Sequence, residues 1–298
     1  MTKALLMITM LTLAACQPAP PNESKSSGAD ASAPREATVT SADGVTIRYQ
    51  TRGQGPTALV FVHGWSCDLD YWRDQLDAFD DSYQVVTLDL AGHGESSADR
   101  PVWTVAGLGQ DVVAVADALK LDQMILVGHS MGGPVTLAAA GAMPGRVLGV
   151  VGADTLHDAS ITYTPGEVGQ AMAAFQADWA GSITGMFSGM SGQAMKPVLR
   201  DWIVAKAVAA NPEVGVALFG DYARMDVPGL LAGAGVPVRV INAAAGGMTP
   251  ETKVELNRQY ADFDAVIMEG VGHFLQLEAP QAFNTALAAV LQEIEAGG

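Results

Sequence analysis

A serine stands in a glycine-rich turn between an apolar run and a helical pattern. The turn lies in the segment LVGHSMGG, residues 126–133. Glycines permit a sharp turn in which a side chain would clash, so we expect the hydroxyl of Ser130 to be exposed at the edge of a sheet. The start of the following helix and the backbone N–H of Met131 favour negative charge beside that hydroxyl. The pattern therefore predicts a nucleophilic serine rather than a structural one.

Three segments together resemble the α/β-hydrolase family. These are the G-x-S-x-G turn around Ser130, the segment VHGW at 62–65 and the segment DLAGHGES at 89–96. The resemblance runs from Val45 to the end of the chain, apart from a variable middle segment. It implies an oxyanion hole made by the backbone N–H groups of Trp65 and Met131. The family also has members with an aspartate nucleophile, and the serine here favours an acyl-enzyme route instead.

The resemblance also indicates which histidine is the base. His273, in the segment VGHF, follows the last predicted strand and comes after the serine in the chain, as in the family. It would take the proton of Ser130 and return it to the leaving group. Among the five histidines, His157 is the rival near the site. We interpret His63 and His93 as structural.

The acidic partner of the histidine is absent from its usual place. In many relatives it follows the strand that corresponds to 236–242, but here the segment AAAGG at 243–247 has no carboxylate. A second arrangement in the family has the acid at the end of the strand after the nucleophile helix. Asp154 occupies that place, and we predict that it orients the imidazole. Asp158 and then Glu251 are the next candidates, and a helix-capping role for Asp154 is the structural alternative.

The middle segment is predicted to form a helical lid over a substrate pocket. Residues 155–225 are rich in Ala, Gly, Met and Trp and contain no clear strand. Methionine-rich surfaces adapt to varied shapes, so we expect an apolar cavity for a small to medium ester or lactone. We predict that the side chains that contact the substrate are those of His129, His157, Tyr71 and Phe187. A catalytically silent binding lipoprotein, an acyltransferase and a carbon–carbon bond hydrolase are the alternatives.

Apolar runs alternate with helical patterns along the rest of the chain. Residues 38–41 and 45–51 flank an Asp-Gly turn and predict a hairpin. Further strands are expected at 58–62, 84–89, 124–127, 147–153, 236–242 and 265–268, with helices at 69–79, 105–119, 131–142, 249–260 and 279–295. This alternation predicts an α/β fold, a mostly parallel doubly wound sheet with the helical lid inserted after the sixth strand.

The composition excludes two classes of partner. The formal net charge is −16 and the isoelectric point is about 4.5, so nucleic-acid binding is not expected, because phosphate contacts need a basic face. The histidines are scattered and there is no C-x-x-C pair, so neither a metal nor another cofactor is expected. Besides Cys16, the only cysteine is Cys67, which predicts no disulfide within the chain.

The first residues read as a targeting segment. An apolar run too short to span a bilayer ends in Leu-Ala-Ala before Cys16. This resembles the lipobox of bacterial lipoproteins, which implies a signal peptide at 1–15 and lipidation of Cys16. Residues 17–36 are polar and rich in proline, so we expect a flexible tether before a domain at 37–298. Gln17 in place of Asp favours the outer membrane, facing the periplasm, in a Gram-negative-type cell envelope.

Overall fold

The computed structural model of the protein describes residues 34–244 and 250–297. The expected signal peptide, Cys16 and most of the tether therefore lie outside the described residues, as do residues 245–249 of the loop that lacks a carboxylate. Within the described part, one sheet has the strand order β1-β2-β4-β3-β5-β6-β7-β8. The strands are β1 (Arg35–Thr40), β2 (Thr46–Arg52), β3 (Ala58–Val62), β4 (Gln84–Leu88), β5 (Met124–His129), β6 (Val147–Ala153), β7 (Val238–Ala243) and β8 (Phe263–Met268).

The central strands are parallel and buried, as their apolar sequences predict. β3 and β5 pair in parallel and every residue in both is buried. Such strands need helices on both faces. Among the described strands, β2 runs against the others, because it pairs antiparallel with both β1 and β4. The turn between β1 and β2 contains Gly44 with a φ of +88°. The predicted strands at 58–62 and 147–153 coincide with β3 and β6, and the predicted doubly wound sheet is confirmed.

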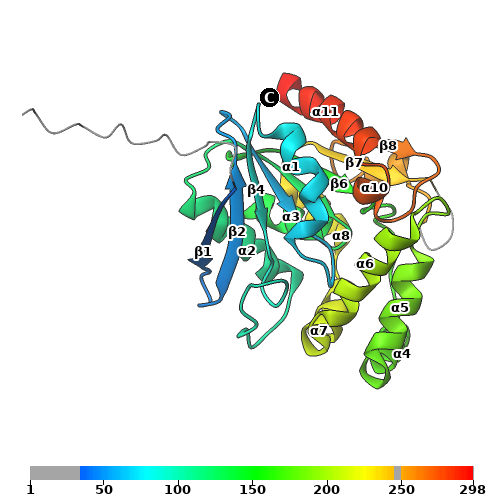
Figure 1. The fold of residues 1–298 in the computed structure, drawn as a ribbon. Coiled ribbons are helices and arrows are strands. Elements are labelled where there is room, and N and C mark those ends of the chain that lie inside the picture. Colours follow the sequence, from blue (N-terminus) through cyan, green and yellow to red (C-terminus); the bar gives the residue numbers. More distant parts are fainter. Residues whose placement is uncertain (1–33, 245–249, 298) are drawn as a thin grey trace, which may run out of the picture. The chain divides into compact units, whose positions relative to one another are not determined.

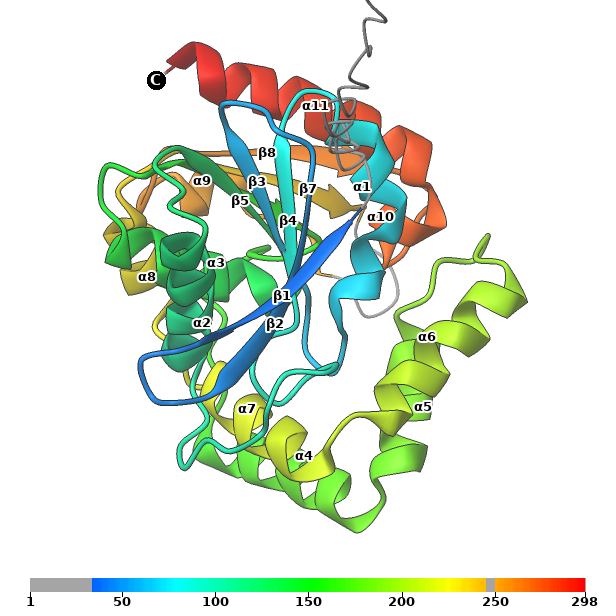
Figure 2. The same ribbon diagram turned by 60° about the vertical axis from the view of Figure 1, so that its left-hand side comes forward.

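Helices cover the sheet on both sides (Figures 1 and 2). One face carries α1 (Arg73–Phe79), α10 (Leu275–Glu278) and α11 (Pro280–Gly297), and the other carries α2 (Val105–Ala118), α3 (Gly132–Ala142) and α8 (Val227–Ala234). Two buried apolar clusters fill the spaces between the sheet and these two layers. Burial of this apolar surface is the main force that fixes the positions of the strand ends.

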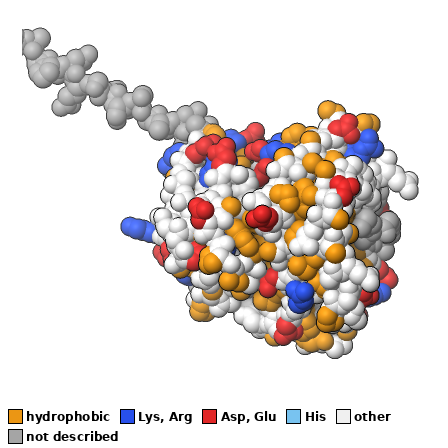
Figure 3. All heavy atoms as spheres, turned by 90° about the horizontal axis from the view of Figure 1, so that it is seen from below, with side chains coloured by type: hydrophobic (Ala, Val, Ile, Leu, Met, Phe, Trp, Pro, Cys, Tyr) orange, Lys and Arg blue, Asp and Glu red, His pale blue; other side chains and the backbone are white. Residues whose placement is uncertain are grey.

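Between β6 and β7 the chain leaves the sheet and forms the inserted helices. They are α4 (Pro165–Ala177), α5 (Trp179–Gly189), α6 (Pro197–Ala209) and α7 (Pro212–Tyr222), followed by α8 on the sheet. Their starts follow capping rules, because a Thr164–Glu167 capping box opens α4 and the side chain of Asn211 opens α7. They lie together beyond one end of the sheet (Figures 1 and 2). Seen from the side of α4 and α7, apolar side chains lie among charged ones (Figure 3).

Two expectations about helices need correction. The helix predicted over 249–260 is only α9 (Val254–Asn257). The N–H of Lys253 donates to the carbonyl of His157, at 2.7 Å, instead of to a helical partner. The expected helices also omitted α8, which packs against α3 before β7.

In 34–244 and 250–297, no single helix is long and apolar enough to cross a membrane. The pair α6 and α7 reaches the required length and composition only when both helices are counted, and it is bent by 96°.

Candidate active site

The turn between β5 and α3 holds Ser130 in a strained conformation. Its φ is +52°, which is uncommon for any residue other than glycine. The neighbouring glycines make the turn possible, because a Cβ on Gly128 would lie 2.3 Å from the carbonyl oxygen of Gly132. The N–H of Ser130 donates to the carbonyl of Ala153 at the end of β6, at 3.0 Å. The sharp turn thus places the serine side chain at the carboxyl end of the sheet.

Asp154 lies at the end of the adjacent strand and contacts the predicted base. Its Oδ2 lies 2.5 Å from Nδ1 of His273, and its Oδ1 accepts from the N–H of Ala243 at 2.8 Å. The side chain is fully buried. Burial alone would raise the pKa of Asp154, but the contacts with His157 and His273 outweigh it and hold that pKa well below its usual value. Asp154 is therefore an ionised carboxylate beside an imidazole.

The other two candidate acids have different partners. Oδ1 of Asp158 accepts from the hydroxyl of Ser160 at 2.6 Å, and the exposed Glu251 pairs with Lys253 at 2.9 Å. Among the described residues, Asp154 is the carboxylate within hydrogen-bond distance of the His273 ring.

Main-chain contacts hold the loop that carries His273. Its N–H donates to the carbonyl of Met190 in the insertion, at 2.9 Å, and Nε2 of His129 lies 2.9 Å from its carbonyl oxygen. The carboxylate of Glu278 accepts from the N–H groups of Gly272 and Phe274 on either side of it. Burial lowers the pKa of His129 to about 3, so His129 stays neutral and donates to that carbonyl. His129 thus contacts the backbone of the predicted base.

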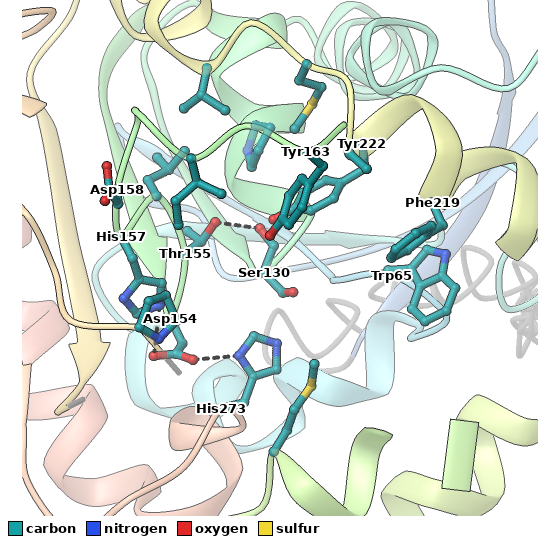
Figure 4. A pocket seen from close by; sticks show the side chains of 18 of the residues that line it. Trp65, Ser130, Asp154, Thr155, His157, Asp158, Tyr163, Phe219, Tyr222 and His273 are labelled. Atoms are coloured by element: carbon teal, nitrogen blue, oxygen red, sulfur yellow. Dashed lines mark hydrogen bonds and ion pairs between the residues drawn. The ribbon is translucent and has the colours of Figure 1, made fainter. Parts of the chain in front are cut away.

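Figure 4 shows the candidate site with Ser130 facing the same pocket as His273. The structure thus brings Ser130, Asp154 and His273 together from three separate strand ends. His157 is also near, with Nε2 3.5 Å from Oδ1 of Asp154, but its Nδ1 lies 3.2 Å from the hydroxyl of Thr252. The rival histidine therefore lies on the far side of the carboxylate from His273.

The loop that carries Trp65 packs closely against the turn that carries Ser130. A Cβ on Gly64 would lie 3.0 Å from Cβ of Ser130, so the two backbones approach closely. In the described part of the chain, the N–H groups of Trp65 and Met131 donate to no protein acceptor. His63 has a structural environment here, because its Nε2 accepts from the N–H of Leu90 at 3.0 Å and burial lowers its pKa to about 4. Two backbone donors are thus available beside the serine.

Two cavities meet at the serine. The larger holds about 500 Å³ and is lined by both body and insertion. The smaller holds about 40 Å³. Five residues line both cavities: Trp65, Ser130, Met186, Met190 and His273. Both are largely apolar, as the sequence predicted, and a bound molecule would have room for one large and one small group.

The four predicted substrate contacts lie in different places. His157 lines the larger cavity, whereas His129 and Phe187 line the smaller one. Tyr71 lines neither cavity, so its prediction as a substrate contact needs correction. It is fully buried, its hydroxyl donates to the carbonyl of Ile203 at 3.2 Å, and its ring packs on Trp202. Aromatic type and closeness to the oxyanion loop in sequence do not reveal on which side of that loop a ring lies.

Some residues of the site were missed by sequence reasoning. Tyr163 lines the larger cavity from the segment before α4, and Glu278 holds the histidine loop. Asn242 holds the Asp154 loop, because its side chain accepts from the N–H of Thr155 and donates to the carbonyl of the same residue. A polar residue that interrupts a buried strand, as Asn242 does, was the available signal.

The described residues contain no group of three or more side chains suited to hold a metal ion. Cys67 is buried, and burial raises the pKa of its thiol well above the usual value. It is therefore not a thiolate at neutral pH.

Comparisons with known proteins identify the family of the chain. Residues 57–280 match the family model described as the alpha/beta hydrolase fold, and the chain belongs to this family. It is 27% identical to 3-oxoadipate enol-lactonase 2 of Acinetobacter baylyi over 86% of this chain and 96% of that protein. It is 32% identical to the dihydrolipoyllysine-residue acetyltransferase component of the acetoin cleaving system of Cupriavidus necator, over 82% of this chain and 66% of that protein.

Solved structures show the same fold. A thermophilic esterase from Thermogutta terrifontis superposes with a TM-score of 0.75 at 23% identity, covering 87% of this chain and 99% of that one. Est816, described as an N-acyl homoserine lactone degrading enzyme, superposes with a TM-score of 0.74 at 26% identity. The match covers 85% of this chain and 99% of that one. The match to the family model and the similarity to the enol-lactonase support hydrolase activity.

Proposed function

We propose that this protein is a serine hydrolase that cleaves carboxylic esters or lactones of small to medium apolar substrates through an acyl-enzyme. The observation that carries the proposal is the contact of 2.5 Å between Asp154 and the ring of His273 in the pocket that Ser130 faces. A buried carboxylate fixes the tautomer of the imidazole and stabilises its cation. The family's esterase and lactonase members support the substrate class.

The first half of the proposed reaction forms the acyl-enzyme. Oγ of Ser130 attacks the carbonyl carbon of the substrate while Nε2 of His273 takes the hydroxyl proton. The negative oxygen of the tetrahedral intermediate accepts from the N–H groups of Trp65 and Met131. Fixed donors of this kind stabilise the oxyanion by about 3 kcal/mol for one donor. His273 then passes its proton to the leaving alcohol oxygen as the ester bond breaks.

The second half of the reaction returns the enzyme to its starting state. His273 takes a proton from a water molecule, which attacks the acyl carbon, and then returns that proton to Oγ of Ser130 as the acid leaves. Asp154 remains ionised throughout. Its low pKa, maintained by the contacts with His157 and His273, is consistent with that role.

The proposal is tested with the purified domain and a panel of p-nitrophenyl esters and lactones, together with a fluorophosphonate probe. We expect ester hydrolysis and covalent labelling of Ser130, located by peptide mapping. Binding of esters without labelling of Ser130 and without turnover would instead indicate a catalytically silent binding protein. Transfer of the acyl group to an added alcohol in preference to water would make it an acyltransferase.

We also propose, from the sequence alone, that Cys16 is lipidated and anchors the protein in the outer membrane. Metabolic labelling with palmitate tests this, with Cys16→Ser as the control variant. Equal labelling of both proteins would contradict the proposal.

A further inference from the structure

Most polar side chains that line the larger cavity already have partners in the chain. The hydroxyl of Thr155 donates to the carbonyl of Ser130 at 2.7 Å, and Asp158 accepts from Ser160. His157 contacts Asp154 on one ring nitrogen and Thr252 on the other. These groups have little capacity left for a substrate.

Two tyrosines that line the same cavity differ from these groups. In the described chain, no hydrogen bond joins the hydroxyl of Tyr163 or Tyr222 to another residue. Tyr163 is 53% exposed, so water can form a hydrogen bond with its hydroxyl. Tyr222 lies deeper, and burial is the main cause that raises its pKa to about 12. Its hydroxyl therefore keeps its proton. The residue is half-buried and its hydroxyl is not among the buried atoms without a partner, so a substrate that fills the cavity would displace water from it.

The position of Tyr222 suits a contact with the substrate near the scissile bond. Figure 4 shows Tyr163 and Tyr222 beside each other on the wall across Ser130 from His273. Tyr222 is the last residue of α7, and the preceding Asp221 accepts from the N–H of Val105 at the start of α2, at 2.8 Å. The end of α7 is thus tied to the body, so the backbone that carries Tyr222 is held in place before a ligand binds.

Among the described residues, the other side chains of this wall are mostly apolar. Apolar side chains line the cavity around the tyrosines, among them Leu156, Phe175, Phe219, Met225 and Val227. A substrate made only of alkyl groups would leave the Tyr222 hydroxyl without a partner, which costs free energy in an apolar cavity.

We propose that Tyr222 is a specificity-determining hydrogen-bond donor, and that the preferred substrate carries a second acceptor oxygen, of a ketone or an amide, on the group that enters the larger cavity. The inference rests on the proposed ester or lactone hydrolysis and narrows its substrate class. The role is one of binding, so Ser130, Asp154 and His273 act in the same way on either kind of substrate.

The test compares matched esters with and without the acceptor. Ethyl hexanoate and its mono-keto derivatives carry the acceptor on the acyl side, and butyl acetate and its mono-keto derivatives carry it on the alcohol side. Hydrolysis is followed by titration of released acid for the wild type, Tyr222→Phe and Tyr163→Phe. Tyr83→Phe is the matched control, since that hydroxyl contacts Glu295 on the exposed surface.

We expect the wild type to prefer at least one keto ester over its plain counterpart by about tenfold in kcat/KM, the size of one neutral hydrogen bond. Tyr222→Phe should remove that preference and leave the plain ester within about twofold of wild type, whereas Tyr83→Phe should keep it. The series in which the preference is found identifies the group that enters the larger cavity.

Two results would overturn the inference while ester hydrolysis itself persists. One is a wild type without preference for any keto ester. The other is a Tyr222→Phe variant that loses equal activity on keto and plain esters, which would mean a structural role. A wild type that hydrolyses none of these esters would overturn the proposed function as well.

Discussion

The end of the sheet and the inserted helices meet at one cavity, but they satisfy their polar groups in different ways. On the sheet side, Asp154 accepts from Ala243 and contacts His273, and the side chain of Asn242 bonds to the backbone of Thr155 and to the hydroxyl of Thr252. On the insertion side, the wall is mostly apolar and the hydroxyl of Tyr222 lacks a partner among the described residues.

This difference separates two tasks. Stabilising a transition state needs dipoles that are already oriented, and strand ends held by many bonds supply them. Choosing a substrate needs shape and a few polar contacts, and apolar, methionine-containing helices supply those. We therefore expect changes at the strand ends to affect kcat and changes in the insertion to affect KM.

The largest effect should follow removal of the nucleophile. Ser130→Ala should lower kcat by about 10⁵–10⁶, as loss of the serine does in comparable triads. Steady-state hydrolysis of p-nitrophenyl butyrate measures it. Ser188→Ala, at an exposed position in α5, is the matched control and should keep full activity. Residual turnover above one per cent in Ser130→Ala would place the nucleophile elsewhere.

A smaller effect concerns the stability of the body. Burial lowers the pKa of His63 to about 4 and those of His93 and His129 to about 3. Because these values lie below that of an unfolded histidine, about 6.5, the unfolded chain takes up protons first as the pH falls. Stability is therefore full above about pH 6.5 and falls below it by about 1.4 kcal/mol per pH unit for each histidine.

Urea unfolding between about pH 7 and pH 5 measures this slope. His93→Gln should reduce it by about 1.4 kcal/mol per pH unit, since one buried imidazole is then absent. A free energy of unfolding that stays constant over this range would show that these histidines are not neutral and buried in solution.

The smallest effect should come from the insertion. Phe175 on α4 lines the cavity and packs on Trp65, with ring centroids 5.3 Å apart. Phe175→Leu should raise KM for long apolar esters by about three- to tenfold and leave kcat within about twofold, because the group binds ground state and transition state alike. A fall in kcat with KM unchanged would show that the insertion takes part in the chemical step.

Much of the body could be predicted because its residues follow strong local patterns. β3 and β6 match their predicted bounds, since apolar runs between turn residues leave little choice. The glycines around Ser130 predicted the turn in which the structure holds it at a φ of +52°. Asp154 was selected because it ends the strand beside the serine turn, and the structure places it against His273.

What could not be predicted depends on contacts between distant segments. Tyr71 has an aromatic side chain near the oxyanion loop in sequence, yet its hydroxyl bonds to Ile203, more than a hundred residues away. The helix expected over 249–260 is short because Lys253 bonds to the backbone of His157. Neither partner is visible in the local sequence.

The most direct test of the account compares two carboxylates. Asp154→Asn keeps the size of a side chain that contacts His273, while Glu251→Gln changes an exposed carboxylate paired with Lys253. With p-nitrophenyl butyrate, we predict that Asp154→Asn lowers kcat by about 10³–10⁴ while Glu251→Gln retains wild-type activity. An Asp154→Asn enzyme with nearly full activity, beside an inactive Glu251→Gln enzyme, would contradict the assignment of Asp154 as the partner of His273.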